Sequence, residues 1–228
     1  MIAIIPARGG SKRIPGKNIK EFCGKPMISH AISNSLNSEV FRKVYVSTDD
    51  DVIADVSLQS GAEIARIRPK EISDDFTPVS SVIAEEIKFI KPEDEWVVLI
   101  YATSPLLKPR FLIDAAEEIK RLSDDIEFMI SIGKYSGVFE RILFKDDQDL
   151  LKMNEPKHNF SRTQDLTNIY FDAGQFVFGR RDSWSSHKSI WECSIKGFLL
   201  PSHITVDIDE PRDWEYASKI MENYKDDI

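Results

Sequence analysis

The chain has 228 residues, of which 42% are hydrophobic and 30% charged, and its formal net charge is -8. This length and composition predict one soluble α/β domain with an ordinary core, and they exclude a membrane-spanning protein because no window is apolar enough to cross a bilayer. The acidic balance argues against a nucleic-acid-binding protein, which would present a basic face.

The N-terminal residues, MIAIIPARGG, have no basic residue ahead of their apolar run and reach Arg8 at once. A secretory signal peptide begins with basic residues, so we expect a cytoplasmic protein. The two cysteines, Cys23 and Cys193, are far apart and belong to no CxxC motif. They predict neither a disulfide framework nor a zinc site.

Strand-like runs rich in Ile and Val alternate with helix-like segments through residue 132. In chain order the pattern predicts strands at residues 2–5, 43–48, 62–67, 96–102 and 128–132, and helices at 25–36, 50–61, 78–90 and 109–122. Pro26 and Pro109 stand at predicted helix starts, and Gly61 at a helix end. Because the strands are apolar throughout, we expect a mostly parallel sheet covered by helices on both faces.

The alternation stops near Gly133, where residues 137–153 favour a hairpin or an irregular excursion. It resumes with predicted strands at 195–201 and 203–210. An amphipathic helix is predicted over 211–224, with Trp214, Ala217, Ile220 and Met221 on its apolar side. We therefore predict a single domain over residues 1–228, with residues 133–170 as an insertion.

A short basic stretch, IIPARGGSKRIPGKN, spans residues 4–18 and begins at the end of the first predicted strand. Its glycines allow a tight turn in which backbone N–H groups point at one anion, and its Arg and Lys side chains add charge-assisted hydrogen bonds. This pattern predicts a phosphate cradle, and the alternative is an exposed, solvated basic loop. The stretch is not a P-loop, because five residues separate Gly10 from Gly16 and Asn18 replaces the hydroxyl residue.

A second motif, VDIDE, covers residues 206–210. In a strand, Asp207 and Asp209 would point to one face, about 7 Å apart. Two carboxylates on one face make a hard-oxygen site suited to Mg²⁺, which takes further ligands from substrate phosphates. The alternative is that Asp209 caps the helix beginning near Pro211 while Asp207 is solvated. A third acidic group, residues 49–51, favours a helix start.

Several motifs together carry a family resemblance. The stretch IIPARGGSKRIPGKNIKEFCGKPMI resembles the N-terminal signature of sugar cytidylyltransferases, the enzymes that make CMP-activated acidic sugars. VSTDDDVIADV, RPKEISDD, ATSPLL and VDIDEPRDW match further landmarks of that family in the expected order. Members that act on N-acetylneuraminate usually have glutamine where this chain has Tyr101. SDDFTP, Tyr101 and SRTQDLTNIYFDAGQFVFG resemble most the members that act on pseudaminic acid.

The resemblance implies a three-layer, Rossmann-like nucleotidyltransferase fold in which insertion 133–170 is a dimerisation arm and the chain is a homodimer. It also implies a reaction in which the anomeric hydroxyl of a nonulosonic acid attacks the α-phosphate of CTP and pyrophosphate leaves, with Mg²⁺ as cofactor. The expected sugar is pseudaminic acid, and the alternatives are N-acetylneuraminic and legionaminic acid. An alternative from another class is a nucleotide-binding regulatory module without turnover.

Residue roles follow from the cradle and from the resemblance. Expected catalytic residues are Arg8, Lys17, Asp207 and Asp209, the two aspartates also being the metal ligands. The expected nucleotide-binding residues are Ala7, Arg8, Gly9, Gly10, Ser11, Lys12, Arg13, Lys17, Asn18, Arg68 and Ser80. The expected sugar-binding residues are Tyr101, Thr103, Arg162, Asp172 and Gln175. Arg162 would hold the sugar carboxylate. Asp172 and Gln175 would bond other polar groups of the sugar; the alternative is that they are polar residues at the exposed end of a core strand.

Overall fold

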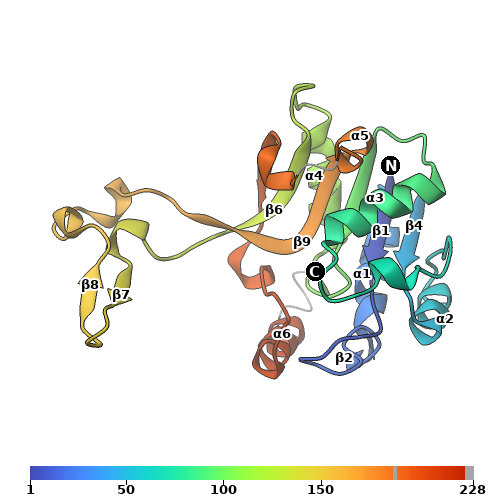
Figure 1. The fold of residues 1–228 in the computed structure, drawn as a ribbon, viewed down its shortest axis with the longest axis horizontal. Coiled ribbons are helices and arrows are strands. Elements are labelled where there is room, and N and C mark those ends of the chain that lie inside the picture. Colours follow the sequence, from blue (N-terminus) through green and yellow to red (C-terminus); the bar gives the residue numbers. More distant parts are fainter. Residues whose placement is uncertain (187–188, 224–228) are drawn as a thin grey trace.

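A computed structural model describes residues 1–186 and 189–223 and is built around a six-stranded sheet with the order β10-β6-β9-β5-β1-β4 (Figure 1). The strands are β1 Ile2–Pro6, β4 Lys43–Ser47, β5 Trp96–Ile100, β6 Phe128–Lys134, β9 Tyr170–Arg180 and β10 Ile195–Leu199. Strand β9 runs antiparallel to both its neighbours, β5 and β6, and the other pairings in this sheet are parallel. The prediction of a mostly parallel sheet is confirmed.

Helices pack against both faces of the sheet. Along β1, Ala3 and Ile5 belong to one core cluster, whereas Ile2 and Ile4 belong to the other. Side chains in the first cluster come from α1 Met27–Asn37, α2 Asp51–Gln59, α4 Pro109–Ile119 and α6 Pro211–Asn223. Side chains in the second come from α3 Val79–Ile90 and α5 Arg181–Trp184. The apolar strands are therefore buried from both sides, as continuous Ile and Val runs predict.

Local sequence signals place the helix ends as predicted. Pro26 precedes α1, and Pro109 is the first residue of α4. Asp50 caps α2 by accepting from the backbone N–H groups of Val52 and Ile53, at 2.9 and 3.0 Å. Gly61 follows α2 with φ +92°, a left-handed conformation that favours glycine. The predicted end of the last helix, Tyr224, lies outside the described residues.

Two predicted strands are wrong. Residues 62–67 run beside β4 but pair with the sheet only at two isolated bridges, Tyr45 with Glu63 and Thr48 with Ile67. Residues 203–210 form no strand, because a 3-10 turn, η6 Ser202–Ile204, opens them and their backbone polar groups bond outside the sheet. Ile208 is nevertheless fully buried in the core. Core burial alone produced the apolar alternation that predicted this strand.

Residues 135–169 leave the sheet between β6 and β9 and extend away from the body as an arm (Figure 1). The arm carries the predicted hairpin, formed by β7 Leu143–Lys145 and β8 Leu151–Met153. A second small hairpin, β2 Glu21–Phe22 and β3 Lys25–Pro26, precedes α1. No helix within the described residues is long and apolar enough to span a membrane. The cytoplasmic location stays a prediction.

Candidate functional site

A cavity of about 330 Å³ opens where β1 and β5 end. Pro6 and Arg8 reach it from β1 and the residues beyond, and Tyr101, Ala102 and Thr103 follow β5. Open α/β sheets bind ligands at the carboxyl ends of parallel strands, so this is the expected edge. The predicted site residues that line the cavity are Arg8, Ser11, Lys12, Arg13, Lys17, Asn18, Arg68, Tyr101 and Thr103.

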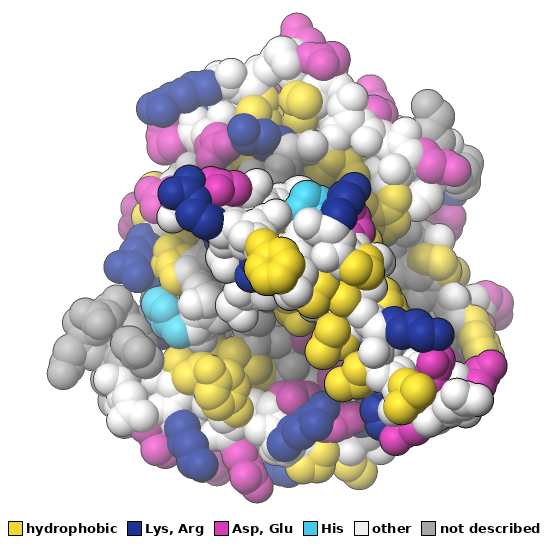
Figure 2. Space-filling view, turned by 90° about the vertical axis from the view of Figure 1, so that its left-hand side faces the viewer, with side chains coloured by type: hydrophobic (Ala, Val, Ile, Leu, Met, Phe, Trp, Pro, Cys, Tyr) yellow, Lys and Arg dark blue, Asp and Glu magenta, His cyan; other side chains and the backbone are white. Residues whose placement is uncertain are grey.

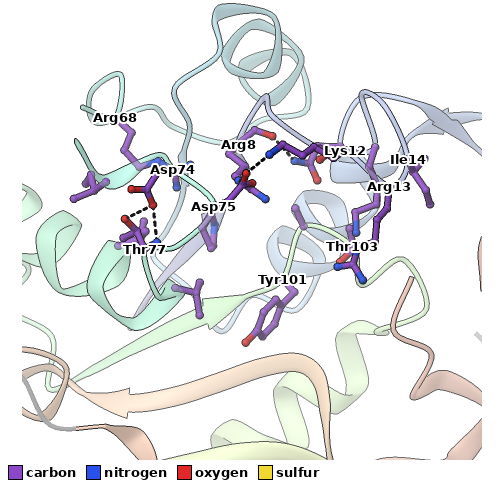
Figure 3. Close-up of a pocket in the computed structure, with 18 residues that line it drawn as sticks. Arg8, Lys12, Arg13, Ile14, Arg68, Asp74, Asp75, Thr77, Tyr101 and Thr103 are labelled. Carbon is purple, nitrogen blue, oxygen red and sulfur yellow. Dashed lines mark hydrogen bonds and ion pairs between the residues drawn. The ribbon is translucent and has the colours of Figure 1, made fainter. Parts of the chain in front are cut away.

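The cavity is lined by many cations and by several apolar side chains. Its lining includes the cations Arg8, Lys12, Arg13, Lys17 and Arg68 and only two carboxylates, Asp74 and Asp75. Its apolar lining residues are Ile72, Val79 and Val82, near the start of α3, and Ile14 of the basic loop, which lies beside Arg13 (Figure 3). A ligand that combines a flat, weakly polar group with several negative charges matches this lining.

The backbone of the basic loop is held in place by its own hydrogen bonds. The N–H of Gly9 donates to Asp49 Oδ1 at 3.1 Å, and a Cβ at Gly9 would lie 2.5 Å from Asp50 Oδ2. Ala7 donates its N–H to the Ser47 carbonyl, and Ser11 donates to that of Gly9. The amides of Ala7, Gly9 and Ser11 are therefore already bonded within the chain, and the predicted cradle would have to use other amides and the side chains.

Other parts of the loop remain open to a ligand. The N–H groups of Gly10, Lys12 and Arg13 make no hydrogen bond with a described residue. Asn18 is buried and donates from Nδ2 to the Arg8 carbonyl at 3.0 Å, so it fixes the loop from within. Gly16 has φ +63°, which only glycine adopts readily. The loop thus presents side chains and a few free amides.

Lys17 joins the basic loop to the aspartate segment near the C-terminus. Its Nζ donates to the Ile208 carbonyl at 2.7 Å and to Asp209 Oδ1 at 3.2 Å, and its side chain is only 16% exposed. Arg13 also pairs with Asp209, at 2.9 Å. Two of the predicted phosphate-binding cations therefore meet a predicted metal ligand, although they lie far from it in the sequence.

Asp207 is the second carboxylate of this segment and is exposed to solvent. It makes no hydrogen bond or ion pair with any described residue. Partial desolvation and the charge of Asp209 raise the pKa of Asp207. Among the described residues, no group of three or more His, Cys, Asp or Glu side chains could hold a metal ion. Two mutually repelling carboxylates with few further protein ligands fit Mg²⁺, which completes its shell with water and phosphate oxygens.

The capping role at the start of α6 belongs to Asp213. Its Oδ2 accepts from the backbone N–H groups of Asp209 and Glu210, at 3.1 and 2.7 Å. The carboxylate of Asp209 instead faces Lys17 and Arg13. The interpretation of Asp209 as a helix cap is therefore wrong. A carboxylate three residues after the N-cap is the capping-box arrangement, and the sequence DEPRD contains that signal.

Arg68 and Ser80 lie in different places. Arg68 is 4% exposed, lines the cavity, donates to Ser73 Oγ at 3.0 Å and pairs with Asp49 at 3.7 Å. Burial lowers its pKa from the ordinary arginine value. Ser80, in the first turn of α3, lines a separate cavity together with Trp184 and Ser189. The structure does not bring Ser80 to the site.

Tyr101 and Thr103 line the cavity on the β5 side (Figure 3). Burial, followed by the charges of Asp172 and Asp207, raises the pKa of Tyr101 to about 12. The tyrosine therefore keeps its proton at neutral pH and can donate it in a hydrogen bond. Asp172 is exposed at the start of β9 and accepts from the Gly174 N–H at 2.9 Å. The two acidic groups thus lie within electrostatic range of the Tyr101 ring.

Three predicted sugar-binding residues, Asp172, Gln175 and Arg162, do not line this cavity. Gln175 is 1% exposed and donates from Nε2 to the Ala173 carbonyl at 2.9 Å and to the Val206 carbonyl at 3.5 Å. It supports the backbone ahead of Asp207 and has no access to a ligand. Arg162 lies in the arm, 72% exposed, and is paired with Asp165 at 2.8 Å.

Sequence reasoning missed Asp49, Asp74 and Asp75. Asp49 holds the Gly9 amide, and Asp75 pairs with both Arg8 and Lys12. Asp74 accepts from the N–H groups of Phe76 and Thr77 and from the Thr77 hydroxyl. The sequence DDFTP, just ahead of α3, carried the signal for the Asp74 turn, because Asp and Thr side chains cap such turns. Nothing local marks Asp75 as a partner of the basic loop.

Comparison with known proteins identifies the family. A profile of the cytidylyltransferase family matches residues 2–225. The chain belongs to this family. Pseudaminic acid cytidylyltransferase of Campylobacter jejuni is 38% identical over 95% of this chain and 94% of its own length. The CMP-N,N'-diacetyllegionaminic acid synthase of Legionella pneumophila is 31% identical over 97% of this chain and 96% of its own length.

A solved structure of CMP:2-keto-3-deoxy-manno-octonic acid synthetase complexed with CTP has the same fold as this cytidylyltransferase. The TM-score is 0.72 at 18% identity, and the match covers 97% of this chain and 98% of that one. At this identity the likeness concerns the fold alone. The family match confirms the class that the motifs predict, a CTP-dependent sugar cytidylyltransferase.

Proposed function

We propose that the chain transfers CMP from CTP to the anomeric hydroxyl of pseudaminic acid and releases pyrophosphate. One observation carries the proposal. Lys17, which lines the cavity, bonds Asp209, which does not, so the basic loop after β1 and the aspartate segment before α6 meet beside the cavity. A cationic surface beside two hard-oxygen ligands is the arrangement that phosphoryl and nucleotidyl transfer require, because such catalysis depends on positioning and charge stabilisation.

The triphosphate is assigned to Arg8, Ser11, Lys12, Arg13 and Lys17, whose side chains line the cavity. Arg8 and Lys17 are the proposed catalytic cations: Lys17, beside Asp209, is assigned to the α-phosphate, where charge grows in the transition state, and Arg8 to the β- and γ-phosphates. Arg68 and the apolar wall of Ile72, Val79 and Val82 are assigned to the nucleoside. Ser80 is left out of this assignment because it lines another cavity.

Asp207 and Asp209 are the proposed ligands of Mg²⁺. A bound Mg²⁺ neutralises charge on the phosphate oxygens and makes the α-phosphate a better electrophile. Lys17 and Arg13, both in the basic loop, pair with the Asp209 carboxylate and fix its position. Asp213 and Gln175 position the segment, since they bond its backbone at Asp209, Glu210 and Val206.

The sugar acid is assigned to the side of the cavity formed by Tyr101 and Thr103. The Tyr101 hydroxyl, protonated at neutral pH, is assigned to donate to a polar group of the sugar, and Asp172, whose charge acts on Tyr101, to accept from another. The identity to the pseudaminic acid enzyme, 38% against 31% for the legionaminic acid enzyme, supports pseudaminic acid as the substrate. N-acetylneuraminic and legionaminic acid are the alternatives.

The arm is proposed to join two copies of the chain. It exposes large apolar side chains, including Leu150 at 59%, Leu151 at 60% and Phe160 at 95%, and Figure 2 shows hydrophobic groups gathered on this side. Monomers rarely expose such a surface, whereas homodimer interfaces bury one. In the dimer, Arg162 of one copy would bind the sugar carboxylate in the partner's cavity. Sedimentation at micromolar concentration tests this, and a single 26 kDa species would remove its basis.

The reaction itself is tested by incubating the protein with CTP, Mg²⁺ and pseudaminic acid and measuring pyrophosphate and CMP-sugar. We expect both products in equal amounts, and a loss of turnover of about 100-fold or more in Arg8→Ala and Lys17→Ala. Near-normal turnover in both variants would overturn the site. Release of neither product with any nonulosonic acid, together with tight CTP binding, would favour a regulatory nucleotide-binding module.

A further inference from the structure

Asp75 occupies two cations of the proposed triphosphate site at once. Its Oδ1 accepts from Arg8 Nη1, and its Oδ2 accepts from Lys12 Nζ, as the dashed lines in Figure 3 show. Both carboxylate oxygens are therefore committed to side chains of the basic loop. These hydrogen bonds lower the pKa of Asp75, so the group stays ionised at neutral pH. Its side chain is 32% exposed, which leaves it open to exchange.

The segment that carries Asp75 is fixed on both sides. On one side, Arg68 Nε donates to Ser73 Oγ, and that hydroxyl donates to the Pro69 carbonyl at 2.8 Å. On the other side, Asp74 closes a turn with Thr77 just before α3. Asp75 lies between these anchors and lines the cavity. Its place opposite Arg8 and Lys12 is thus set by the fold of its own segment.

We propose that Asp75 is an internal counter-ion that competes with the β- and γ-phosphates of CTP, and with pyrophosphate, for Arg8 and Lys12. The inference rests on the proposed function, which assigns both cations to the triphosphate. Arg8 and Lys12 keep other N–H donors, but a phosphate gains the donors that Asp75 occupies, and the full charge of both cations, only by displacing the carboxylate. A nucleoside monophosphate has no group at this position and does not compete.

This competition affects both the binding of the substrate and the release of the product. Before transfer, it restricts Arg8 and Lys12 to ligands with several adjoining negative charges. After transfer, pyrophosphate no longer has the nucleoside to hold it, and the returning Asp75 carboxylate takes back Arg8 and Lys12. Asp75 therefore sets specificity for the triphosphate and favours release of pyrophosphate.

The test compares Asp75→Asn with the wild type by calorimetric titration of pyrophosphate, CTP and CMP without Mg²⁺. Asparagine keeps the shape of the side chain and leaves the Asp74 turn in place. Two partly exposed ion pairs are worth little individually, so we expect pyrophosphate and CTP to bind about threefold to tenfold tighter. The affinity for CMP should stay within about twofold. Product inhibition by pyrophosphate in the Mg²⁺-dependent reaction should strengthen by the same factor as its binding.

Glu71→Gln is the matched control, because Glu71 is an exposed carboxylate of the same segment, in η1 Lys70–Ile72, and makes no hydrogen bond or ion pair with the basic loop within the described residues. It should change none of the three affinities. Unchanged or weaker binding of pyrophosphate and CTP to Asp75→Asn would overturn the inference, as would an equal gain in Glu71→Gln or for CMP. If the wild type bound neither CTP nor pyrophosphate, the proposed function would fail first, which is a distinct result.

Discussion

Separate substitutions of Asp209, just before α6, and Asp213, in its first turn, distinguish a residue that acts in the reaction from one that stabilises the fold. Asp213 accepts two backbone N–H groups, at 2.7 and 3.1 Å, and so stabilises the helix start. Asp209 gives its carboxylate to Lys17 and Arg13. We expect Asp213→Ala to lower stability and Asp209→Asn to lower turnover, with little overlap between the two effects.

The magnitudes follow from these contacts. Loss of a capping carboxylate costs about 1 to 2 kcal/mol, which for a chain of this length lowers Tm by roughly 2 to 8 °C. Asp209→Asn removes ion pairs whose members are 16% to 65% exposed, so its effect on stability should stay below about 1 kcal/mol. Asparagine ligates Mg²⁺ poorly, and turnover should fall by about 100-fold or more.

Thermal unfolding and turnover at 25 °C, measured on the same preparations, give both quantities. Asp213 also orders the Asp209 backbone, so a change in turnover of up to about tenfold in Asp213→Ala is compatible with a positioning role. The reasoning would be refuted if Asp209→Asn kept full turnover, or if it unfolded at lower temperature than Asp213→Ala.

Three further predictions concern two buried titratable residues and the arm. His30 is 3% exposed, and its burial lowers its pKa to about 4. Between pH 6.5 and 4 the unfolded chain therefore binds more protons than the folded one. Wild-type stability should fall by about 2 kcal/mol from pH 7 to pH 5. Urea unfolding at both pH values checks this, and His30→Gln, which keeps a donor for the Phe22 carbonyl, should flatten the dependence. Lys108 is 7% exposed, and burial lowers its pKa to about 8. Its charge therefore destabilises the folded state at neutral pH. This destabilisation decreases as pH rises from 8 to 10.5, because the folded chain loses the charge first. Lys108→Met should stabilise the protein by about 1 to 3 kcal/mol at pH 7 and much less at pH 10.5, and equal gains at both would contradict the assignment. Arg162→Ala should raise KM for the sugar acid about tenfold or more with KM for CTP unchanged; an effect confined to CTP would count against a sugar-side role.

Much of the fold was accessible from sequence because its signals are local. The apolar runs of β1, β4, β5 and β6, the prolines at the starts of α1 and α4, and Gly61 after α2 each depend on neighbouring residues alone. The antiparallel β9 was not predicted, since its place between β5 and β6 depends on where the chain returns from the arm. The predicted strand at residues 203–210 failed because Ile208 is buried without a strand partner.

The site was predictable as a set of residue types and not as a set of contacts. The basic loop and the Asp207–Asp209 pair were visible because their residues are adjacent in the sequence. The bond from Lys17 to Asp209 joins segments 192 residues apart, and no periodicity encodes it. Asp75 was missed for the same reason. Gln175 was predicted to face the sugar, because strand alternation does not reveal the bulge or the left-handed Gly174 that change the direction of this part of β9.

The central claim, attack of the sugar hydroxyl on the α-phosphate of CTP, is tested most directly by isotope transfer. Pseudaminic acid labelled with ¹⁸O at its anomeric hydroxyl would be mixed with CTP, Mg²⁺ and the protein in unlabelled water, and the products analysed by ³¹P NMR and mass spectrometry. The account predicts ¹⁸O in the oxygen that bridges sugar and phosphorus of the CMP-sugar, and unlabelled pyrophosphate. Label in pyrophosphate, or unlabelled CMP as the only nucleotide product, would contradict it.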